Sequence, residues 1–245
     1  MTVLDTVIGI VIVPFLIALF AILVFEVLRT PHFEVFLPES ETVRYALYEG
    51  HRELNYLPAK FCKLSITNKP LLTRPWLSRF TAFNAKCLVT IADKETRAVV
   101  NDISNIACKW DAREEPSSAG IPFFNPQNNQ LQFAANPSHF VYLVQQANFL
   151  DLHSKSEPEN VAIVMKIQGD SECYLFSGES YESPRQWRRQ DRMIPQGEFV
   201  MLVQISSENA KSSVYEFSIS NNGTTRDGFR IEQVKTSKKP LVKRI

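Results

Sequence analysis

The chain has 245 residues and a formal net charge of +1, because 27 Lys and Arg are balanced by 26 Asp and Glu. This balance gives no electrostatic support for a nucleic-acid-binding protein. Hydrophobic residues at 44% and charged residues at 22% describe an ordered chain and exclude a disordered one. Four Cys and eight Gly exclude a disulfide-dense scaffold and a collagen-like or Gly-rich chain.

The first feature along the chain is an uncharged apolar run of 20 residues from Thr6 to Phe25. At about 1.5 Å per residue, a helix of this length spans about 30 Å, the hydrocarbon thickness of a bilayer. Pro14 lies within the run, and membrane helices tolerate such a proline. After a short tail over residues 1–5, we therefore predict one transmembrane helix over residues 6–28 and a single-pass protein in the lipid bilayer.

A cleaved signal peptide and a buried core helix are the alternatives for this run. A signal peptide needs a basic start, a shorter apolar region and a small-residue cleavage site. Residues 1–5 contain no Lys or Arg, so the basic start is missing.

The orientation of the helix follows from the charges on its two sides. Arg29 and Arg44 follow the run, and no Lys or Arg precedes it. The positive-inside rule therefore favours a body on the cytoplasmic side of the membrane.

Beyond the run, hydrophobic and polar residues alternate, which is typical of half-buried strands. Pro, Asn, Ser and Gly clusters separate the alternating segments, and helical periodicity is rare. We expect an all-β fold, a β-sandwich with large loop insertions, over residues 59–234. The clearest strands are predicted at residues 59–67, 85–92, 139–145, 161–167, 199–205 and 214–220.

Other segments do not follow this alternation. Residues 41–57 are compatible with a helix or a strand, residues 69–84 form an apolar insertion broken by prolines, and residues 110–130 have the composition of a loop. We expect residues 29–58 to connect the helix to the sandwich and to supply its first strand. Since no internal repeat is visible, one sandwich with large loops is favoured over two packed sandwiches.

Three short sequence motifs lie in or beside the predicted strands: Thr67–Pro70 (TNKP), Ala85–Val89 (AKCLV) followed by Trp110, and Ile194–Phe199 (IPQGEF). In these motifs the chain resembles prokaryotic membrane-anchored immunoglobulin-like modules over roughly residues 59–220. The resemblance implies an immunoglobulin-like β-sandwich. Many such modules have no assigned activity, so the resemblance informs the fold and not the function.

No sequence motif indicates catalysis, a metal, a cofactor or a small-molecule ligand. The chain lacks the nucleophile elbow, the phosphate-binding loops, the zinc-protease helix motif and the EF-hand loop. Its cysteines, Cys62, Cys87, Cys108 and Cys173, are too widely spaced for a common zinc motif. We predict that the first three are buried, reduced core residues, with inter-strand disulfides as the alternative.

A short helix is predicted over residues 184–192. Ser183 can be its N-cap, Pro184 suits the first helical position and Gln186 completes a capping box. Four arginines share one face of this helix: Arg185, Arg188, Arg189 and Arg192. Because Arg binds phosphate and carboxylate, this face is a candidate contact for an anionic partner, with a solvated or internally paired face as the alternative. Trp187 would anchor the helix on the sandwich or at a membrane interface.

Two further segments are candidate contacts. Trp76, Phe80 and Phe83 lie among leucines and arginines in the insertion, which favours a contact with the membrane or a partner, or else a loop folded over one end of the core. Residues 235–245 carry five Lys and Arg and no acid. Such a basic tail is usually solvated, and in the cytoplasm it can contact anionic headgroups.

These observations favour a non-enzymatic interaction module or accessory subunit, anchored at the membrane surface by one helix. Its partners would be the lipid bilayer and an unidentified protein. A membrane-anchored enzyme with a dispersed active site is the alternative. The one local carboxylate group, Asp111, Glu114 and Glu115 beside Trp110, would usually be solvated surface in a loop.

Overall fold

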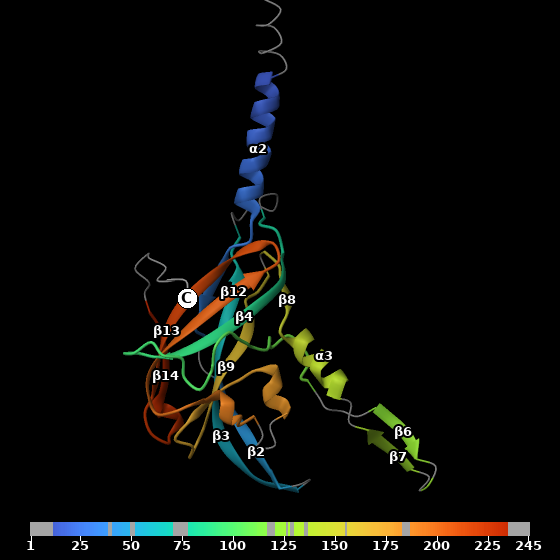
Figure 1. Ribbon diagram of the computed structural model, residues 1–245, viewed down its shortest axis with the longest axis vertical. Helices are drawn as coiled ribbons and strands as arrows, with labels where there is room; N and C mark the ends of the chain where they lie inside the picture. Colours follow the sequence, from blue (N-terminus) through green and yellow to red (C-terminus); the bar gives the residue numbers. More distant parts are fainter. Residues whose placement is uncertain are drawn as a thin grey trace, which may run out of the picture.

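Two six-stranded antiparallel sheets form the body of the protein (Figure 1). The computed structural model describes residues 12–38, 41–49, 52–70, 78–116, 121–125, 127, 130–134, 137–154, 156–182 and 187–234. The first sheet has the order β1 (Phe33–Phe36), β3 (Arg52–Asn68), β9 (Glu159–Ile167), β10 (Cys173–Leu175) and β11 (Met193–Ile194), and β2 (Glu41–Glu49) also pairs with β3. The second sheet has the order β14 (Phe229–Gln233), β13 (Ala210–Asn221), β12 (Gly197–Ser207), β4 (Ala82–Asp93) and β5 (Ile106–Ala107), and β8 (Leu150–Leu152) also pairs with β4.

The remaining elements lie outside these two sheets. They are the helices α2 (Val13–Arg29) and α3 (Pro137–Ala147), the hairpin of β6 (Ile121–Asn125) and β7 (Gln130–Ala134), and the 3-10 turns η3 (Gly178–Glu182), η4 (Gln190–Arg192) and η5 (Arg226–Gly228). The hairpin projects away from the sheets beyond α3 (Figure 1). The predicted all-β class is thus confirmed.

Most of the predicted strands are confirmed. Five of the six alternating segments fall in β3, β4, β9, β12 and β13, and the ambiguous residues 41–57 contribute to β2 and β3. The strand predicted at residues 139–145 is wrong, because this segment lies in α3. Phe140, Val144 and Ala147 recur at helical spacing and are buried, whereas Val141 and Tyr142 are exposed. The helix therefore buries one apolar stripe. The prediction was a strand because residues 140, 142 and 144 are hydrophobic and also fit the period of two.

The main core lies between the two sheets. Alternate residues of facing strands point into it, such as Leu64 of β3 and Val89 of β4, both almost fully buried. Trp110 is fully buried in this core, and its indole N–H donates to the carbonyl oxygens of Ala85 and Asn148, each at 3.2 Å. These bonds satisfy the polar end of a large ring that would otherwise be costly to bury.

A buried lysine connects β9 to the end of β13. Lys166 is fully buried, and its ammonium group donates to the Asn221 side-chain oxygen and the Gly223 carbonyl oxygen, both at 2.9 Å. It also donates to the carbonyl oxygens of Ser171 at 3.1 Å and Glu172 at 3.3 Å. Burial lowers the pKa of this lysine below its ordinary value. The acceptors surround the charge with oxygen atoms and so offset part of its desolvation.

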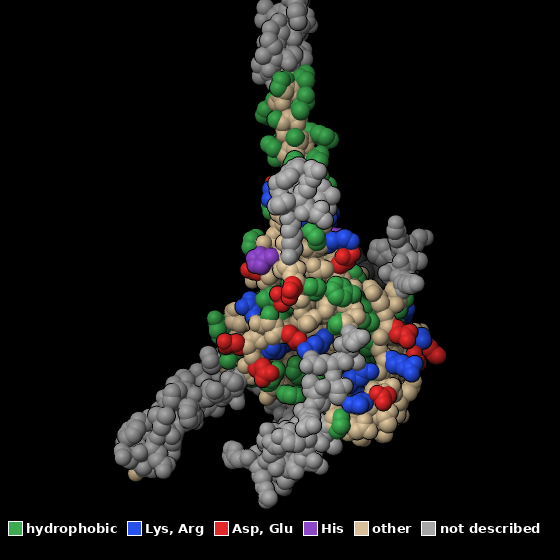
Figure 2. Space-filling view, turned by 180° about the vertical axis from the view of Figure 1, so that it is seen from behind, with side chains coloured by type: hydrophobic (Ala, Val, Ile, Leu, Met, Phe, Trp, Pro, Cys, Tyr) green, Lys and Arg blue, Asp and Glu red, His purple; other side chains and the backbone are tan. Residues whose placement is uncertain are grey.

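α2 extends from one end of the sandwich (Figure 1). None of its described residues is buried against the body, and hydrophobic side chains project from the face of the helix that Figure 2 shows. Phe15 and Phe20 are 66% and 69% exposed. Pro14 and Phe25 lie in this helix, whereas Thr6 lies outside the described residues. Over the described part of the chain, no helix is both long enough and apolar enough to cross a membrane, so the transmembrane span stays a prediction.

Candidate functional site

The end of α2 nearest the sandwich is hydrogen-bonded to the residues that precede β4. The Arg79 guanidinium donates to the carbonyl oxygens of Leu28 at 3.0 Å and Thr30 at 2.8 Å. The Phe80 backbone N–H donates to the Arg29 carbonyl oxygen at 2.7 Å. These bonds satisfy carbonyls that the last helical turn leaves without intrahelical partners, and the positive charge complements the negative end of the helix dipole. The sandwich is therefore attached to α2 by direct contacts, in addition to the connecting chain.

Two of the three aromatic residues predicted as a contact lie at this junction. The Arg29 guanidinium lies 4.4 Å from the centre of the Phe80 ring, a cation–π contact. Phe83 is 49% exposed, and its carbonyl oxygen accepts a hydrogen bond from the Glu208 backbone N–H in the β12–β13 turn. Trp76 lies outside the described residues. Phe80 and Phe83 thus lie at the end of the sandwich from which α2 leaves.

The helix predicted over residues 184–192 is wrong in its described part, residues 187–192. Trp187 has a φ of 66°, a left-handed conformation that a bulky residue rarely adopts in regular structure. Arg189 is extended, and only the 3-10 turn η4 follows it. Since these residues are not helical, the common helix face for the arginines does not form. Arg185 lies outside the described residues.

The three described arginines of this segment form ion pairs within the chain. The pairs and their nitrogen–oxygen distances are Arg188–Asp170 at 2.8 Å, Arg189–Asp191 at 2.8 Å, Arg189–Glu179 at 3.2 Å and Arg192–Glu179 at 3.0 Å. Arg188 contacts both oxygens of Asp170, the bidentate geometry that suits guanidinium. The hydrogen bond from Arg189 holds the pKa of Asp191 below its ordinary value. The arginines therefore tie residues 187–192 to the body through internal pairs.

Trp187 packs on the outer face of the first sheet in a cluster of four aromatic rings. Its ring lies 5.8 Å from Phe61, 5.7 Å from Phe176 and 6.0 Å from Tyr181, measured between centroids. All three contacts are edge-to-face, the arrangement that aromatic quadrupoles favour. Of the two positions predicted for Trp187, the structure shows the one on the sandwich body, although the predicted helix is absent from residues 187–192.

A cavity of about 530 Å³ opens above this cluster, and we call it the Trp187 pocket. Its floor is the four rings, and its rim is formed by Lys63 of β3 and residues 109–115. The cavity volume is within the range of about 300–1,000 Å³ that is usual for ligand pockets. The carboxylates noted in the sequence beside Trp110 therefore lie at the rim of an aromatic cavity.

The cations around this pocket bind groups of the protein itself. Lys63 pairs with Asp111 at 2.8 Å. Lys109 is buried, and its ammonium group donates to the carbonyl oxygens of Trp110 at 3.1 Å and Arg113 at 2.7 Å. Burial lowers the pKa of Lys109, while the nearby Asp111 carboxylate opposes that shift. The Arg113 guanidinium donates to a backbone carbonyl at 2.7 Å.

The carboxylates of the rim are more accessible than these cations. Glu114 and Glu115 are exposed. The Tyr181 hydroxyl hydrogen-bonds the Glu115 carboxylate, and the pKa of Tyr181 is raised, first by burial and then by this carboxylate. The hydroxyl acts as a hydrogen-bond donor to this carboxylate at the edge of the pocket.

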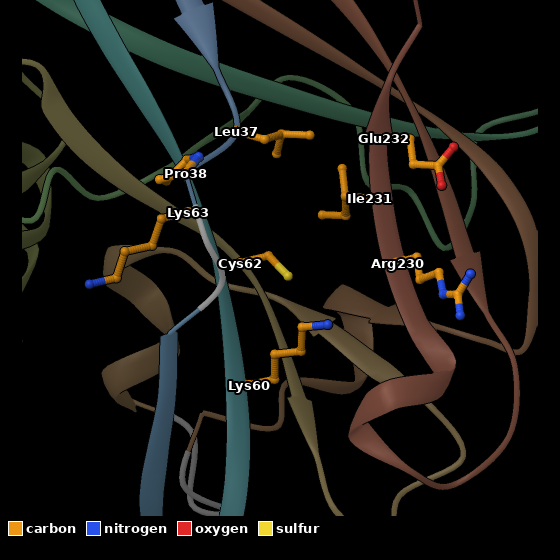
Figure 3. Close-up of a pocket in the computed structure, with 8 residues that line it drawn as sticks. All are labelled: Leu37, Pro38, Lys60, Cys62, Lys63, Arg230, Ile231 and Glu232. Atoms are coloured by element: carbon orange, nitrogen blue, oxygen red, sulfur yellow. The ribbon is translucent and has the colours of Figure 1, made fainter.

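A smaller cavity of about 230 Å³ lies between β3 and β14 (Figure 3). Cys62 and Ile231 point into it, whereas Lys63 and Arg230 point away from it (Figure 3). The Lys60 ammonium group donates to the Phe229 carbonyl oxygen at 3.0 Å and so links the two sheets beside the cavity. Burial raises the pKa of the Cys62 thiol to about 12, so the thiolate needed for nucleophilic chemistry is scarce at neutral pH.

All four cysteines are buried and free of disulfides, so the predicted burial of Cys62, Cys87 and Cys108 is confirmed. We expect the native protein to resist a thiol-alkylating reagent, because burial removes both access and thiolate character. After unfolding without reductant, mass spectrometry should find all four cysteines alkylated. A disulfide-linked peptide joining any two of them in the same sample would contradict this assignment.

None of the comparisons, with family models, with curated proteins or with solved structures, found a match to this chain. Among the described residues, no group of three His, Cys, Asp or Glu side chains is placed to hold a metal ion. Among the described residues, the candidate sites that we consider further are the junction of α2 with the sandwich and the Trp187 pocket.

Proposed function

We propose that this protein is a membrane-anchored interaction module or accessory subunit, whose N-terminal helix holds an immunoglobulin-like β-sandwich at a membrane surface. The observation that carries the proposal is the surface of α2. Phe15, Phe20 and Leu28 lie on different sides of the helix, and all three are exposed large apolar residues. A helix that is apolar on every side and has no protein cover fits a membrane environment better than water.

The sequence supports the same anchor. The uncharged run continues before α2 as far as Thr6, which gives the length that a bilayer requires. Arg29 and Arg79 lie together at the opposite end of the helix, next to the sandwich. Cations at one end of a membrane helix favour the cytoplasmic side for that end, so we place the sandwich in the cytoplasm.

The immunoglobulin-like assignment is supported by the core. Two antiparallel sheets enclose a fully buried tryptophan, Trp110, which packs in the same cluster as Cys87 of β4. A buried tryptophan between two antiparallel sheets is typical of immunoglobulin-like domains. The fold of such domains alone does not assign an activity.

Affinity capture of the full chain from gently solubilised membranes tests the interaction module. We expect a second protein to elute with the chain in a constant ratio and to remain with it through gel filtration. Elution of the chain alone in neutral detergents of several kinds would contradict the proposal.

A further inference from the structure

We propose that the Trp187 pocket binds a basic side chain, Lys or Arg, presented by the protein partner of this module. The inference deepens the proposed function by naming the chemistry of the partner. It rests on the aromatic floor of the pocket and on the exposed carboxylates at its rim. It also rests on the cations around the pocket, which already bind groups of the protein itself.

The floor offers ring surfaces suited to a cation. Trp187 and Tyr181 are partly exposed at the cavity, while Phe61 and Phe176 are buried beneath them. A cation within about 6 Å of an aromatic centroid is attracted by the ring quadrupole, and tryptophan gives the strongest attraction. The aliphatic stem of a Lys or Arg side chain also buries apolar surface on such rings.

The charges at the rim favour a cationic guest over an anionic one. Formally the rim is balanced, with Lys63, Lys109 and Arg113 opposite three carboxylates. Accessibility breaks this balance. Lys63 and Asp111 pair with each other, and Lys109 is buried with its ammonium group on backbone carbonyls. Arg113 is partly exposed, and its guanidinium donates to the Phe149 carbonyl oxygen. Glu114 and Glu115 are exposed, so an entering side chain meets negative charge first.

The backbone of Trp187 is in the left-handed conformation. Its φ of 66° is rare for a bulky residue, and strained conformations of this kind cluster at binding sites. The strained residue supplies part of the floor of the pocket. The ion pairs of Arg188 with Asp170 and of Arg189 with Glu179 link the residues directly after it to other segments of the body.

Three small probes of equal length test the charge preference in the full chain, held in nanodiscs of zwitterionic lipid. Butylammonium mimics the end of a lysine side chain, butanol is its neutral counterpart and butyrate is its anionic counterpart. The reporter is the NMR signal of the Trp187 indole N–H, assigned by its loss in Trp187→Phe. At constant ionic strength, we expect butylammonium to bind at least about threefold more tightly than butanol, with butyrate the weakest.

A charge-reversed variant tests the role of the rim. We expect Glu114→Lys to reduce the affinity for butylammonium by about threefold or more. The matched control is Glu95→Lys, which makes the same change at an exposed residue in the turn after β4 and should leave the affinity unchanged. The Trp187 signal of each variant without probe reports whether the pocket is intact.

Equal affinities for butylammonium and butanol, or tighter binding of butyrate, would overturn this inference. An equal loss of affinity in Glu114→Lys and Glu95→Lys would also overturn it. These results concern the pocket only, because extraction of the membranes with alkali decides the anchor separately. If the chain resists extraction but shows no preference for the cation, the inference about the pocket is wrong and the proposed anchor stands.

Discussion

Replacement of Lys166 by Met is expected to destabilise the protein by about 3 kcal/mol, because a buried acceptor that is left without its donor costs about 1–3 kcal/mol. Four oxygens accept from this ammonium group and would lose their donor: the buried Asn221 side-chain oxygen at 2.9 Å and three carbonyl oxygens that are only partly buried. Chemical unfolding of the full chain in detergent, followed by near-ultraviolet circular dichroism, measures the change.

The control for this prediction is Lys94→Met. Lys94 has a side chain that is 52% exposed and pairs with Glu198 at 3.3 Å. A surface pair of this kind contributes little, so the control should change the free energy of unfolding by less than about 1 kcal/mol. Equal effects of the two substitutions would show that the buried oxygens find water or other donors once the ammonium group is gone.

Replacement of Trp110 by Ala is expected to cost about 3–5 kcal/mol, because it opens a large cavity between the two sheets. The indole is fully buried and bonded to two carbonyl oxygens, one before β8 and one in β4. Trp110→Phe separates the two contributions, since it keeps most of the apolar volume but removes the N–H donor. We expect the Phe variant to lose less stability than the Ala variant, in the same unfolding measurement. A loss of less than about 1 kcal/mol in Trp110→Ala would contradict the central position of this residue in the core.

The strands were predictable because burial of one face imposes a period of two, as in β12 and β13. The period-two alternation gave a wrong prediction at residues 139–145, because the hydrophobic residues there fit the helical period as well as the strand period. Pro137 at the first helical position was the signal that favours the helix.

At residues 184–192 a helix was predicted from the sequence, and the described residues are not helical. Its capping signals are local, whereas the position of Trp187 depends on rings supplied by β3 and by residues 176–181.

The sites were less predictable than the fold because distant segments build them. Arg79 caps the end of α2 from a loop far along the chain, and no local pattern indicates that contact. The Trp187 pocket combines β3, β9, the segment after β5 and the segment after β10. Its carboxylates, Asp111, Glu114 and Glu115, are near one another in the sequence, but without the rings beneath them they resemble ordinary solvated surface.

Extraction of membranes with alkaline carbonate tests the anchor on which this account depends. The unchanged chain is expected in the membrane pellet. Phe15→Asp with Leu19→Asp should move it to the supernatant, because each Asp near the centre of a membrane helix costs about 2.5–3.5 kcal/mol. The matched control, Val99→Asp with Val214→Asp, changes two exposed apolar residues of the sandwich and should stay in the pellet. Release of the unchanged chain into the supernatant would contradict the anchor.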